Sequence, residues 1–219
     1  MKILSRILAW LITIFVPFAL TFVGLRLLLT PAFPQVEYRT PGFPADDFGF
    51  TLQDRLHWST ISIEYLVNSA DISFLGNLTF PDGSPLFNER ELSHMQDVKK
   101  VVQPVLWIGY TVWFLVVVCG LWARFGGWWQ EYLRGLRRGG WLTLGLVAAI
   151  GAFAGISFWN FFTVFHELFF SGGSWLFLYS DTLIRLFPLP FWEHAFLFAG
   201  LLDILGGLAL GLGVRPNSK

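Results

Sequence analysis

Four long segments of the sequence are almost free of charged residues, and this pattern constrains the fold more than any other feature. They cover residues 7–30, 101–123, 141–165 and 191–214. At about 1.5 Å per residue, each segment is long enough to cross a hydrocarbon layer of about 30 Å as a helix. We therefore predict an all-α membrane protein, in which residues 1–219 form a single domain built on a bundle of four transmembrane helices.

Composition supports a membrane protein and excludes several other classes. Hydrophobic residues make up 54% of the chain and aromatic residues 18%, far above a typical soluble domain. The formal net charge is zero, so no electrostatic surface for nucleic acid is expected. The single cysteine, Cys119, lies inside an apolar run, which excludes internal disulfides and cysteine-rich metal sites.

The first segment follows two basic residues, Lys2 and Arg6, and could be a signal peptide. Its apolar part is too long for one, however, and no small-residue cleavage site follows it. We interpret it as an uncleaved membrane helix.

The distribution of lysine and arginine predicts the orientation. Basic residues cluster at both termini and in the loop predicted at 124–140, which holds Arg124, Arg134, Arg137 and Arg138. Four spans place these three regions on one side, and basic loops favour the cytoplasm. We expect a multi-pass protein of a cell membrane with both termini cytoplasmic, an extracytoplasmic cap at 31–100 and an outer interfacial segment at 166–190.

Local patterns divide the cap. Residues 31–50 are rich in Pro and Gly and predict irregular structure, whereas residues 51–69 have apolar side chains at helical spacing. A tight turn is expected at 81–84, where the sequence is Pro-Asp-Gly-Ser. Asn88 and Glu91 have the spacing of a capping box, which predicts a helix that continues directly into the second span.

Two histidines far apart in sequence are predicted to lie at the same depth. His94 precedes Val101 by seven residues, about 10 Å along a helix, and shares a helix face with Glu91 and Asp97. His166 stands where the third apolar run ends. Histidine titrates near neutral pH, so both are candidates for acid–base catalysis at the outer headgroup level.

A short interfacial amphipathic helix is predicted after His166. Asp181 could cap it, and its apolar positions surround Arg185.

Several other polar residues allow more than one interpretation. Glu91-x-x-His94 has the spacing of carboxylate-bridged metal sites, but the motif occurs once and no metal is predicted. Arg26 could lie among headgroups or hold a phosphate or carboxylate group. Asp203 is expected to hydrogen-bond a neighbouring helix, because an unpaired carboxyl group is costly in a membrane. Two Gly-x-x-x-Gly pairs, at 151–155 and 207–211, favour close packing of the third and fourth spans.

Two stretches of the sequence carry a resemblance to a known family. "FNERELSHMQDVKKVV" and "FHELFFSGGSWLFLYSDTLIRLFPLPFW" resemble the two signatures of a bacterial family of four-span membrane proteins, the lipoprotein intramolecular transacylases. The stretches cover about a fifth of the chain, and the span count and large first outer loop also agree.

The resemblance implies an activity and a pair of catalytic residues. Members of the family act on lipoproteins whose N-terminal cysteine carries a diacylglyceryl thioether. They move the sn-2 acyl chain to the cysteine amine, which leaves a lyso-form lipoprotein. The catalytic histidines of the two signatures correspond to His94 and His166.

General chemistry is consistent with such a reaction. The amine must lose a proton before it attacks an ester, and the tetrahedral intermediate needs a hydrogen-bond donor for its oxyanion. We expect His94 to act as base and His166 as oxyanion donor or second proton carrier, with the order open. No cofactor, metal or protein nucleophile is required.

The remaining residues are assigned supporting or binding roles. Glu91 or Asp97 would orient His94, and Asp181 would support His166. Substrate binding is assigned to Arg26, Tyr65 and Trp175. The expected partners are diacylglyceryl lipoproteins and membrane lipid, and the sequence leaves the oligomeric state open. Two alternatives also stay open, namely a metal-assisted membrane hydrolase and a non-catalytic member of the same family.

Overall fold

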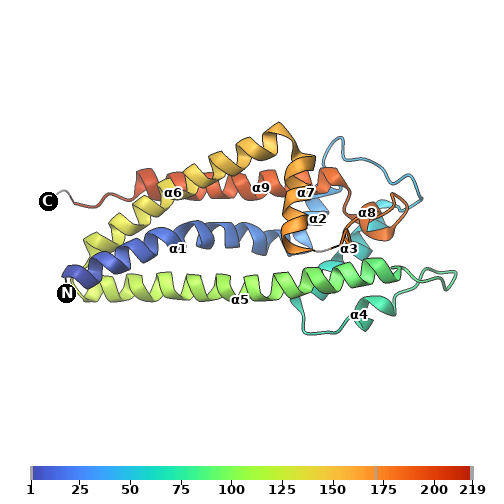
Figure 1. Cartoon of the computed structure of the whole chain (residues 1–219), viewed down its shortest axis with the longest axis horizontal. Coiled ribbons are helices and arrows are strands. Elements are labelled where there is room, and N and C mark those ends of the chain that lie inside the picture. The colour runs from blue at the N-terminus through green and yellow to red at the C-terminus, as the bar shows by residue number, and fades with distance from the viewer. Residues whose placement is uncertain (1, 171, 218–219) are drawn as a thin grey trace. The chain divides into compact units, whose positions relative to one another are not determined.

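The computed structural model describes residues 2–170 and 172–217, and within them it is helical apart from turns and loops (Figure 1). The all-α prediction is confirmed. The helices are α1 (Lys2–Leu28), α2 (Ala32–Glu37), α3 (Leu52–Val67), α4 (Ser73–Gly76), α5 (Glu89–Phe125), α6 (Trp129–Ile156), α7 (Phe158–Phe169), α8 (Thr182–Leu186) and α9 (Leu189–Leu208), which a π-helical turn continues as η1 (Ala209–Gly213).

Four helices are long and apolar enough to cross a membrane, as the sequence predicts. They span Ile3–Leu28, Glu89–Phe125, Trp129–Ile156 and Leu189–Gly213. The chain forms two compact units, which are described separately. Within the described residues, unit 1 comprises 2–25, 106–156 and 197–217, and unit 2 comprises 26–105, 157–170 and 172–196.

The third span differs from the sequence prediction at both ends. Most of the predicted cytoplasmic loop at 124–140 is helical, because α6 already begins at Trp129. The uncharged run at 141–165 is also interrupted, since Ser157 adopts an extended conformation and its side chain accepts a hydrogen bond from the Asn160 amide. This cap makes α7 a separate helix that begins at Phe158. A hydropathy average does not reveal a single capping residue, so the sequence analysis did not predict the break.

In unit 1, α1 packs against α6 through two glycines. A Cβ atom at Gly135 would lie 2.6 Å from the Ala9 carbonyl oxygen, and one at Gly139 would lie 2.5 Å from Cβ of Val16. These positions allow the two backbones to approach closely, as small residues commonly do between membrane helices. The pair escaped the sequence analysis because charged residues around it placed it in a predicted loop.

The two glycine pairs singled out from the sequence behave differently. Gly207 and Gly211 lie against α6, where a Cβ atom at Gly207 would be 3.0 Å from the Gly140 carbonyl oxygen. Gly151 and Gly155 have open space beside them. Of these two pairs, only the one at 207–211 therefore mediates close packing between helices.

Asp203 makes the expected bond to a neighbouring helix in unit 1. The Thr21 hydroxyl donates to its Oδ2 at 2.9 Å, and the residue is only 6% exposed.

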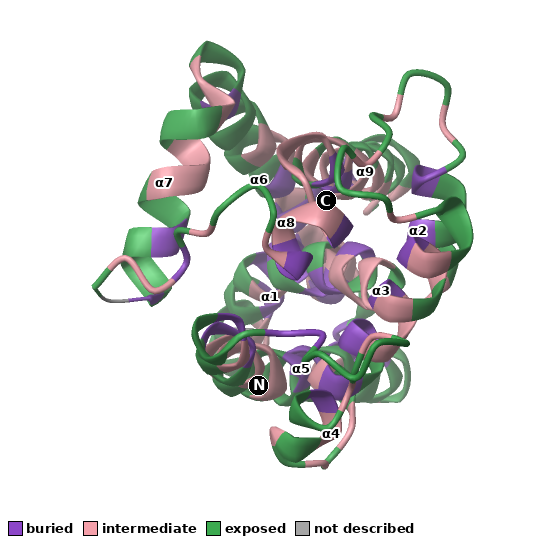
Figure 2. Cartoon of the chain, turned by 90° about the vertical axis from the view of Figure 1, so that its right-hand side faces the viewer, coloured by how far each residue is buried: buried purple, intermediate pink, exposed green. Residues whose placement is uncertain are grey.

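In unit 2, the segment before the second span forms a folded cap with its own core. Buried residues on α3, α4, α5 and α8 and in the turn before α5 gather into one cluster, seen as purple segments on those elements in Figure 2. The cluster contains Tyr65, Leu75, Leu86, Phe87, Met95, Leu183 and Leu186.

Three local expectations for the cap can be compared with its structure. The helix expected at 51–69 is present as α3, and Thr51 caps it in a reciprocal capping box with Asp54. The turn at 81–84 is present, with a single bridge between Thr79 and Pro85. The region at 31–50 is not wholly irregular, because Pro31 precedes a short helix, α2; proline is tolerated where a helix begins.

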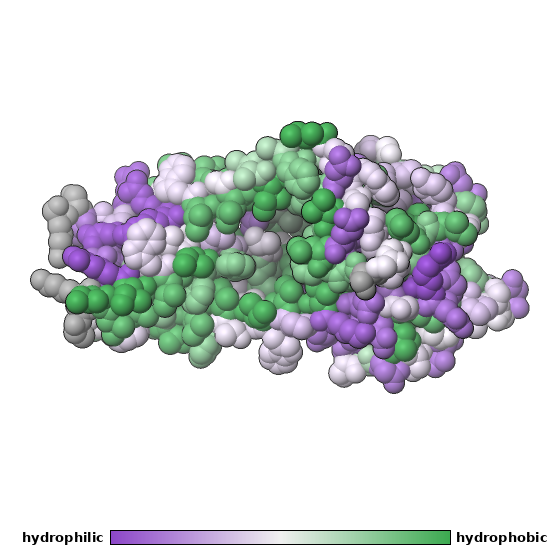
Figure 3. Space-filling model, viewed as in Figure 1, coloured by the Kyte–Doolittle hydropathy of each residue, from purple (hydrophilic) through white to green (hydrophobic). Residues whose placement is uncertain are grey.

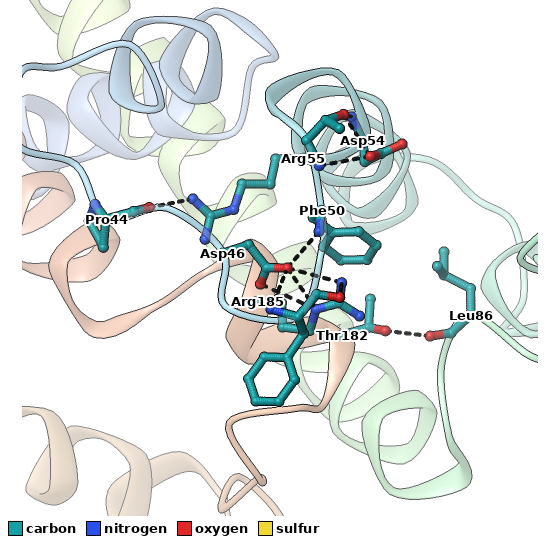
Figure 4. A network of polar contacts seen from close by, with 10 residues as sticks. Pro44, Asp46, Phe50, Asp54, Arg55, Leu86, Thr182 and Arg185 are labelled. Atoms are coloured by element: carbon teal, nitrogen blue, oxygen red, sulfur yellow. Dashed lines mark hydrogen bonds and ion pairs between the residues drawn. The ribbon is translucent and has the colours of Figure 1, made fainter.

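A partly buried ion pair fixes the loop before α3 to α8 (Figure 4). The Arg185 guanidinium contacts the Asp46 carboxylate at 3.0 Å, and that carboxylate also accepts from the backbone amides of Phe48 and Phe50. The Thr182 hydroxyl donates to the Leu86 carbonyl oxygen at 2.6 Å. These bonds join segments of the cap that are distant in sequence.

The start of α5 is fixed by the predicted capping box and by a contact with α8. Asn88 Oδ1 accepts from the Glu91 amide, and Glu91 Oε2 accepts from the Asn88 amide. The other oxygen of Glu91 accepts from the Leu183 amide at 2.7 Å. Glu91 is 1% exposed, so one enclosed carboxylate satisfies an amide in each of two segments.

We predict that Glu91→Ala lowers the free energy of unfolding by about 2–4 kcal/mol, because two enclosed amides lose their acceptor. Thermal unfolding in detergent micelles would measure the change. Glu89→Ala, an exposed glutamate two residues earlier, serves as the control and should leave stability unchanged. Equal unfolding temperatures for the two variants would contradict the proposed contribution of Glu91.

Candidate active site

The long helix α5 positions His94 outside the uncharged span. The helix has 37 residues and is about 55 Å long, well beyond a hydrocarbon core of about 30 Å. Its charged first turns precede the uncharged run at 101–123. His94 lies in those turns, three residues after the enclosed Glu91 and on the same face.

The separate helix α7 positions His166 in its last turn. Its Nδ1 lies 2.8 Å from the Phe162 carbonyl oxygen, one helical turn earlier. A carbonyl oxygen can only accept, so Nδ1 carries the proton of this hydrogen bond. In the neutral ring, Nε2 therefore has a free lone pair.

The two imidazoles lie next to each other within unit 2. Their ring centroids are 6.2 Å apart with an interplanar angle of 21°, and each residue is 8% exposed. Each ring nitrogen lies close to its own centroid, so this separation is too wide for a direct hydrogen bond between the rings. The rings can instead contact one small group, or a water molecule, from two sides.

Aromatic side chains surround the pair. His94 contacts the rings of Phe170 and Phe177, at centroid distances of 4.9 and 5.3 Å. His166 contacts the Trp175 ring at 4.9 Å and also packs against Phe170. The surroundings of both imidazoles are therefore apolar.

Burial in these surroundings changes the protonation of both histidines. Burial, together with a smaller effect of the neighbouring His166, lowers the pKa of His94 to about 4. Burial also lowers the pKa of His166. Both rings are neutral at pH 7, so each has one nitrogen that can donate and one that can accept.

His94 contains an enclosed nitrogen without a partner. Its Nδ1 is fully buried and makes no hydrogen bond within the part of the chain that the structure describes. Buried polar atoms are rarely left unpaired, and exceptions often lie at functional sites. The unpaired nitrogen therefore makes His94 a candidate functional residue.

The acidic residues assigned to support the histidines have other partners. Glu91 binds the Asn88 and Leu183 amides, and Asp97 pairs with Lys100 at 2.9 Å. The Asp181 carboxylate accepts from the Asn88 side chain, from Arg90 and from the Leu178 amide. It occupies the capping position of α8 without a side-chain cap bond. The hydrogen bonds of Glu91 and Asp181 join the segments that carry the site, whereas the Asp97–Lys100 pair lies within α5.

Of the three residues assigned to substrate binding, the structure brings Trp175 beside the histidines. Tyr65 is buried in the cap, where the Lys99 ammonium lies 4.0 Å from its ring centroid. The Arg26 guanidinium donates to the Leu29 carbonyl oxygen at 3.4 Å.

Sequence reasoning missed the aromatic residues that line the site. Phe162, Phe170 and Phe177 contact the histidines, but in an apolar sequence they resemble lipid-facing side chains. The one feature of the sequence that could have indicated these residues is the high density of phenylalanine around His166. As for a metal, no group of three or more possible ligand residues occurs within 2–170 and 172–217.

Comparisons with known proteins identify the family. The family model described as "Lipoprotein intramolecular transacylase Lit" matches residues 6–192. The chain belongs to the Lit family.

Individual relatives are distant in sequence, and the two solved structures among them are similar in fold. The in meso structure of the membrane-integral lipoprotein intramolecular transacylase Lit from Bacillus cereus has a TM-score of 0.80 at 20% identity, over 96% of this chain and 94% of that one. A structure of that Lit with a histidine-to-arginine mutation gives 0.73 at 19% identity, over 95% and 89%. A protein from Aquifex aeolicus (strain VF5), described as uncharacterized, is 25% identical over 94% of this chain and 92% of its own length. The fold is that of a multi-pass membrane protein.

The lowered pKa of His94 predicts how stability depends on pH. Below pH 6.5 the unfolded chain binds a proton at this residue that the folded chain binds only near pH 4. The stability that depends on neutral His94 is therefore fully present above pH 6.5, and it is lost as the pH falls towards 4. We expect His94→Gln to reduce the loss of unfolding temperature between pH 7 and pH 4.5 by several degrees.

Thermal unfolding in detergent at the two pH values would measure this difference. His57→Gln, which changes an exposed histidine of α3, is the control and should follow the unmodified chain. Identical pH dependence in His94→Gln and the unmodified chain would contradict the buried neutral state.

Proposed function

We propose that the chain catalyses transfer of the sn-2 acyl chain of a diacylglyceryl lipoprotein to the amine of its N-terminal cysteine. The family provides the reaction class, and the observation that carries the proposal is the pair of enclosed, neutral imidazoles 6.2 Å apart. In the reaction the amine nitrogen bonds to the ester carbonyl carbon, and the bond from that carbon to the glyceryl oxygen breaks. The proton lost by the amine ends on the glyceryl oxygen, so no other reactant is consumed.

The tautomer of His166 supports a role as the base. Its Nδ1–H is engaged by the Phe162 carbonyl, so the Nε2 lone pair can accept the amine proton and later deliver it to the leaving oxygen. The same hydrogen bond stabilises the imidazolium that forms in between. This assignment reverses the order suggested by the sequence alone, in which His94 was the base.

His94 is then the donor for the oxyanion. With a pKa of about 4 it stays neutral and keeps an N–H group, which can bind the negative oxygen of the tetrahedral intermediate. An apolar wall excludes water, which strengthens this hydrogen bond and limits hydrolysis of the ester. Because the amine and the ester belong to one molecule, their proximity lowers the barrier further.

The proposed location follows from the same residues. Both histidines would lie at the outer leaflet, with both termini in the cytoplasm, as the distribution of arginine predicts. The aromatic side chains of Phe170, Phe177 and Trp175 would contact the acyl chain or glyceryl group.

The reaction can be tested by expressing the chain in a bacterium whose lipoproteins carry a diacylglyceryl cysteine with a free amine. Substrate and product are isomers, so mass spectrometry of the N-terminal peptide is combined with mild alkali, which cleaves only esters. The substrate loses two acyl chains in alkali, and the product loses one and keeps an amide. We expect the product with the unmodified chain, and none with His94→Ala or His166→Ala.

One control variant and two contrary outcomes accompany this experiment. His57→Ala changes a histidine outside the site and should retain the product. A peptide that has lost the mass of one acyl chain before alkali would indicate a hydrolase. An unchanged diacyl form, with the chain present in the membrane, would indicate a non-catalytic member of the family.

The proposed roles predict different responses to glutamine. A glutamine side chain can donate a hydrogen bond but cannot accept a proton as a base. We expect His166→Gln to lower the rate by about 10²–10⁴-fold, and His94→Gln to retain more activity than His94→Ala. The rate of amide formation in membranes that contain each variant would measure this. Greater tolerance of glutamine at position 166 than at position 94 would reverse the roles.

A further inference from the structure

Unit 1 contains a polar cavity at the start of α1 and α6. Its volume is roughly 300 Å³, and its lining residues are Arg6, Trp10, Glu131, Arg134 and Arg138. All of them belong to unit 1, whereas both histidines of the active site belong to unit 2. The lining of the cavity shares no residue with the surroundings of the histidine pair described above.

The cavity carries more positive than negative charge. Arg134 donates to the Glu131 carboxylate at 2.5 Å, which neutralises one of its three arginines. Arg6 and Arg138 have no acidic partner within residues 2–170 and 172–217, and the Arg138 guanidinium lies 4.6 Å from the centroid of the Trp10 ring. Two guanidinium groups are therefore available to a ligand, and the planar guanidinium matches the oxygens of a phosphate group.

The surface beside the cavity is apolar and exposed. Trp10 is 57% exposed, and exposed aliphatic side chains continue along the same helix at Ile3, Ile7, Leu11 and Ile14. In a membrane-spanning helix such a surface faces lipid, and tryptophan is enriched at the boundary with water. Figure 3 shows hydrophilic and hydrophobic side chains next to each other at the end of unit 1 where α1 and α6 begin.

We propose that this cavity binds the phosphodiester headgroup of an anionic glycerophospholipid, whose acyl chains lie along α1. Arg6 and Arg138 bind the phosphate oxygens, and the ion pair with Glu131 holds Arg134 at the rim. Free phosphate shares the charge but gains nothing from the apolar surface. That surface is the reason for assigning a lipid.

The test uses the full chain, purified in a neutral detergent and titrated with phosphatidylglycerol. Native mass spectrometry measures the bound lipid. Phosphatidylcholine with the same acyl chains tests the need for net charge, and inorganic phosphate tests the need for a lipid. We expect retention of phosphatidylglycerol, and a loss of about tenfold or more in its affinity for Arg6→Gln/Arg138→Gln.

A matched double variant controls for the loss of charge. Arg124→Gln/Arg215→Gln removes two exposed arginines outside the cavity lining and should bind phosphatidylglycerol as the unmodified chain does. Arg6→Gln alone is a second test variant, since Arg6 is exposed and makes no ion pair among the described residues, so the fold does not depend on it.

Three results would overturn the proposal. They are unchanged phosphatidylglycerol affinity in Arg6→Gln and in the double variant of the cavity, equal retention of phosphatidylcholine, and displacement of the lipid by inorganic phosphate at equal concentration. The last result would identify a site for free phosphate. The measurement is independent of acyl transfer, so it is unaffected if the proposed function fails.

Discussion

The enclosed carboxylate of Glu91 is the contact on which the arrangement of unit 2 depends. It accepts from the amide of Asn88, just before α5, and from the amide of Leu183 in the first turn of α8. Asp181, just before α8, accepts in return from Asn88 and Arg90 at the start of α5. The two sequence stretches that resemble the family signatures are thus joined by reciprocal hydrogen bonds between residues that lie 92 and 93 positions apart in sequence. His94 follows one of these turns, and Phe177, which contacts His94, precedes the other.

The site is built mainly from apolar groups, and this determines what its two polar residues can do. Aromatic rings lower the pKa of each histidine by burial, so neither imidazole is charged at neutral pH. A neutral pair can accept a proton at one ring and donate a hydrogen bond at the other. In water, the same two side chains would be partly protonated and would compete with solvent for the same groups. The acidic residues nearby stabilise the backbone that holds the site.

Sequence alone predicted those features that depend on local chemistry or on hydropathy. The four spans, the Asn88–Glu91 capping box and α3 follow from patterns within a few turns of a helix, and they were correct. The early start of α6 was missed because charged residues such as Arg137 and Arg138 lower the hydropathy of this part of the helix, which was therefore predicted to be a loop. The break at Ser157 was missed because one side-chain cap does not change the mean polarity of the run. The positions of the two histidines relative to the apolar runs predicted that both lie at one membrane depth. Their separation, their aromatic neighbours and the tautomer of His166 depend on tertiary contacts, which the sequence does not show.

The Nδ1 of His94, which has no hydrogen-bond partner among residues 2–170 and 172–217, has a consequence for the evolution of the chain. An enclosed imidazole nitrogen without a partner reduces the stability of the folded state, whereas leucine or phenylalanine at the same position would suit its aromatic neighbours better. Random substitution under selection for stability alone would therefore remove this histidine. Such a residue is expected where a side chain serves a purpose other than folding, and the proposed role of His94 as oxyanion donor would be one.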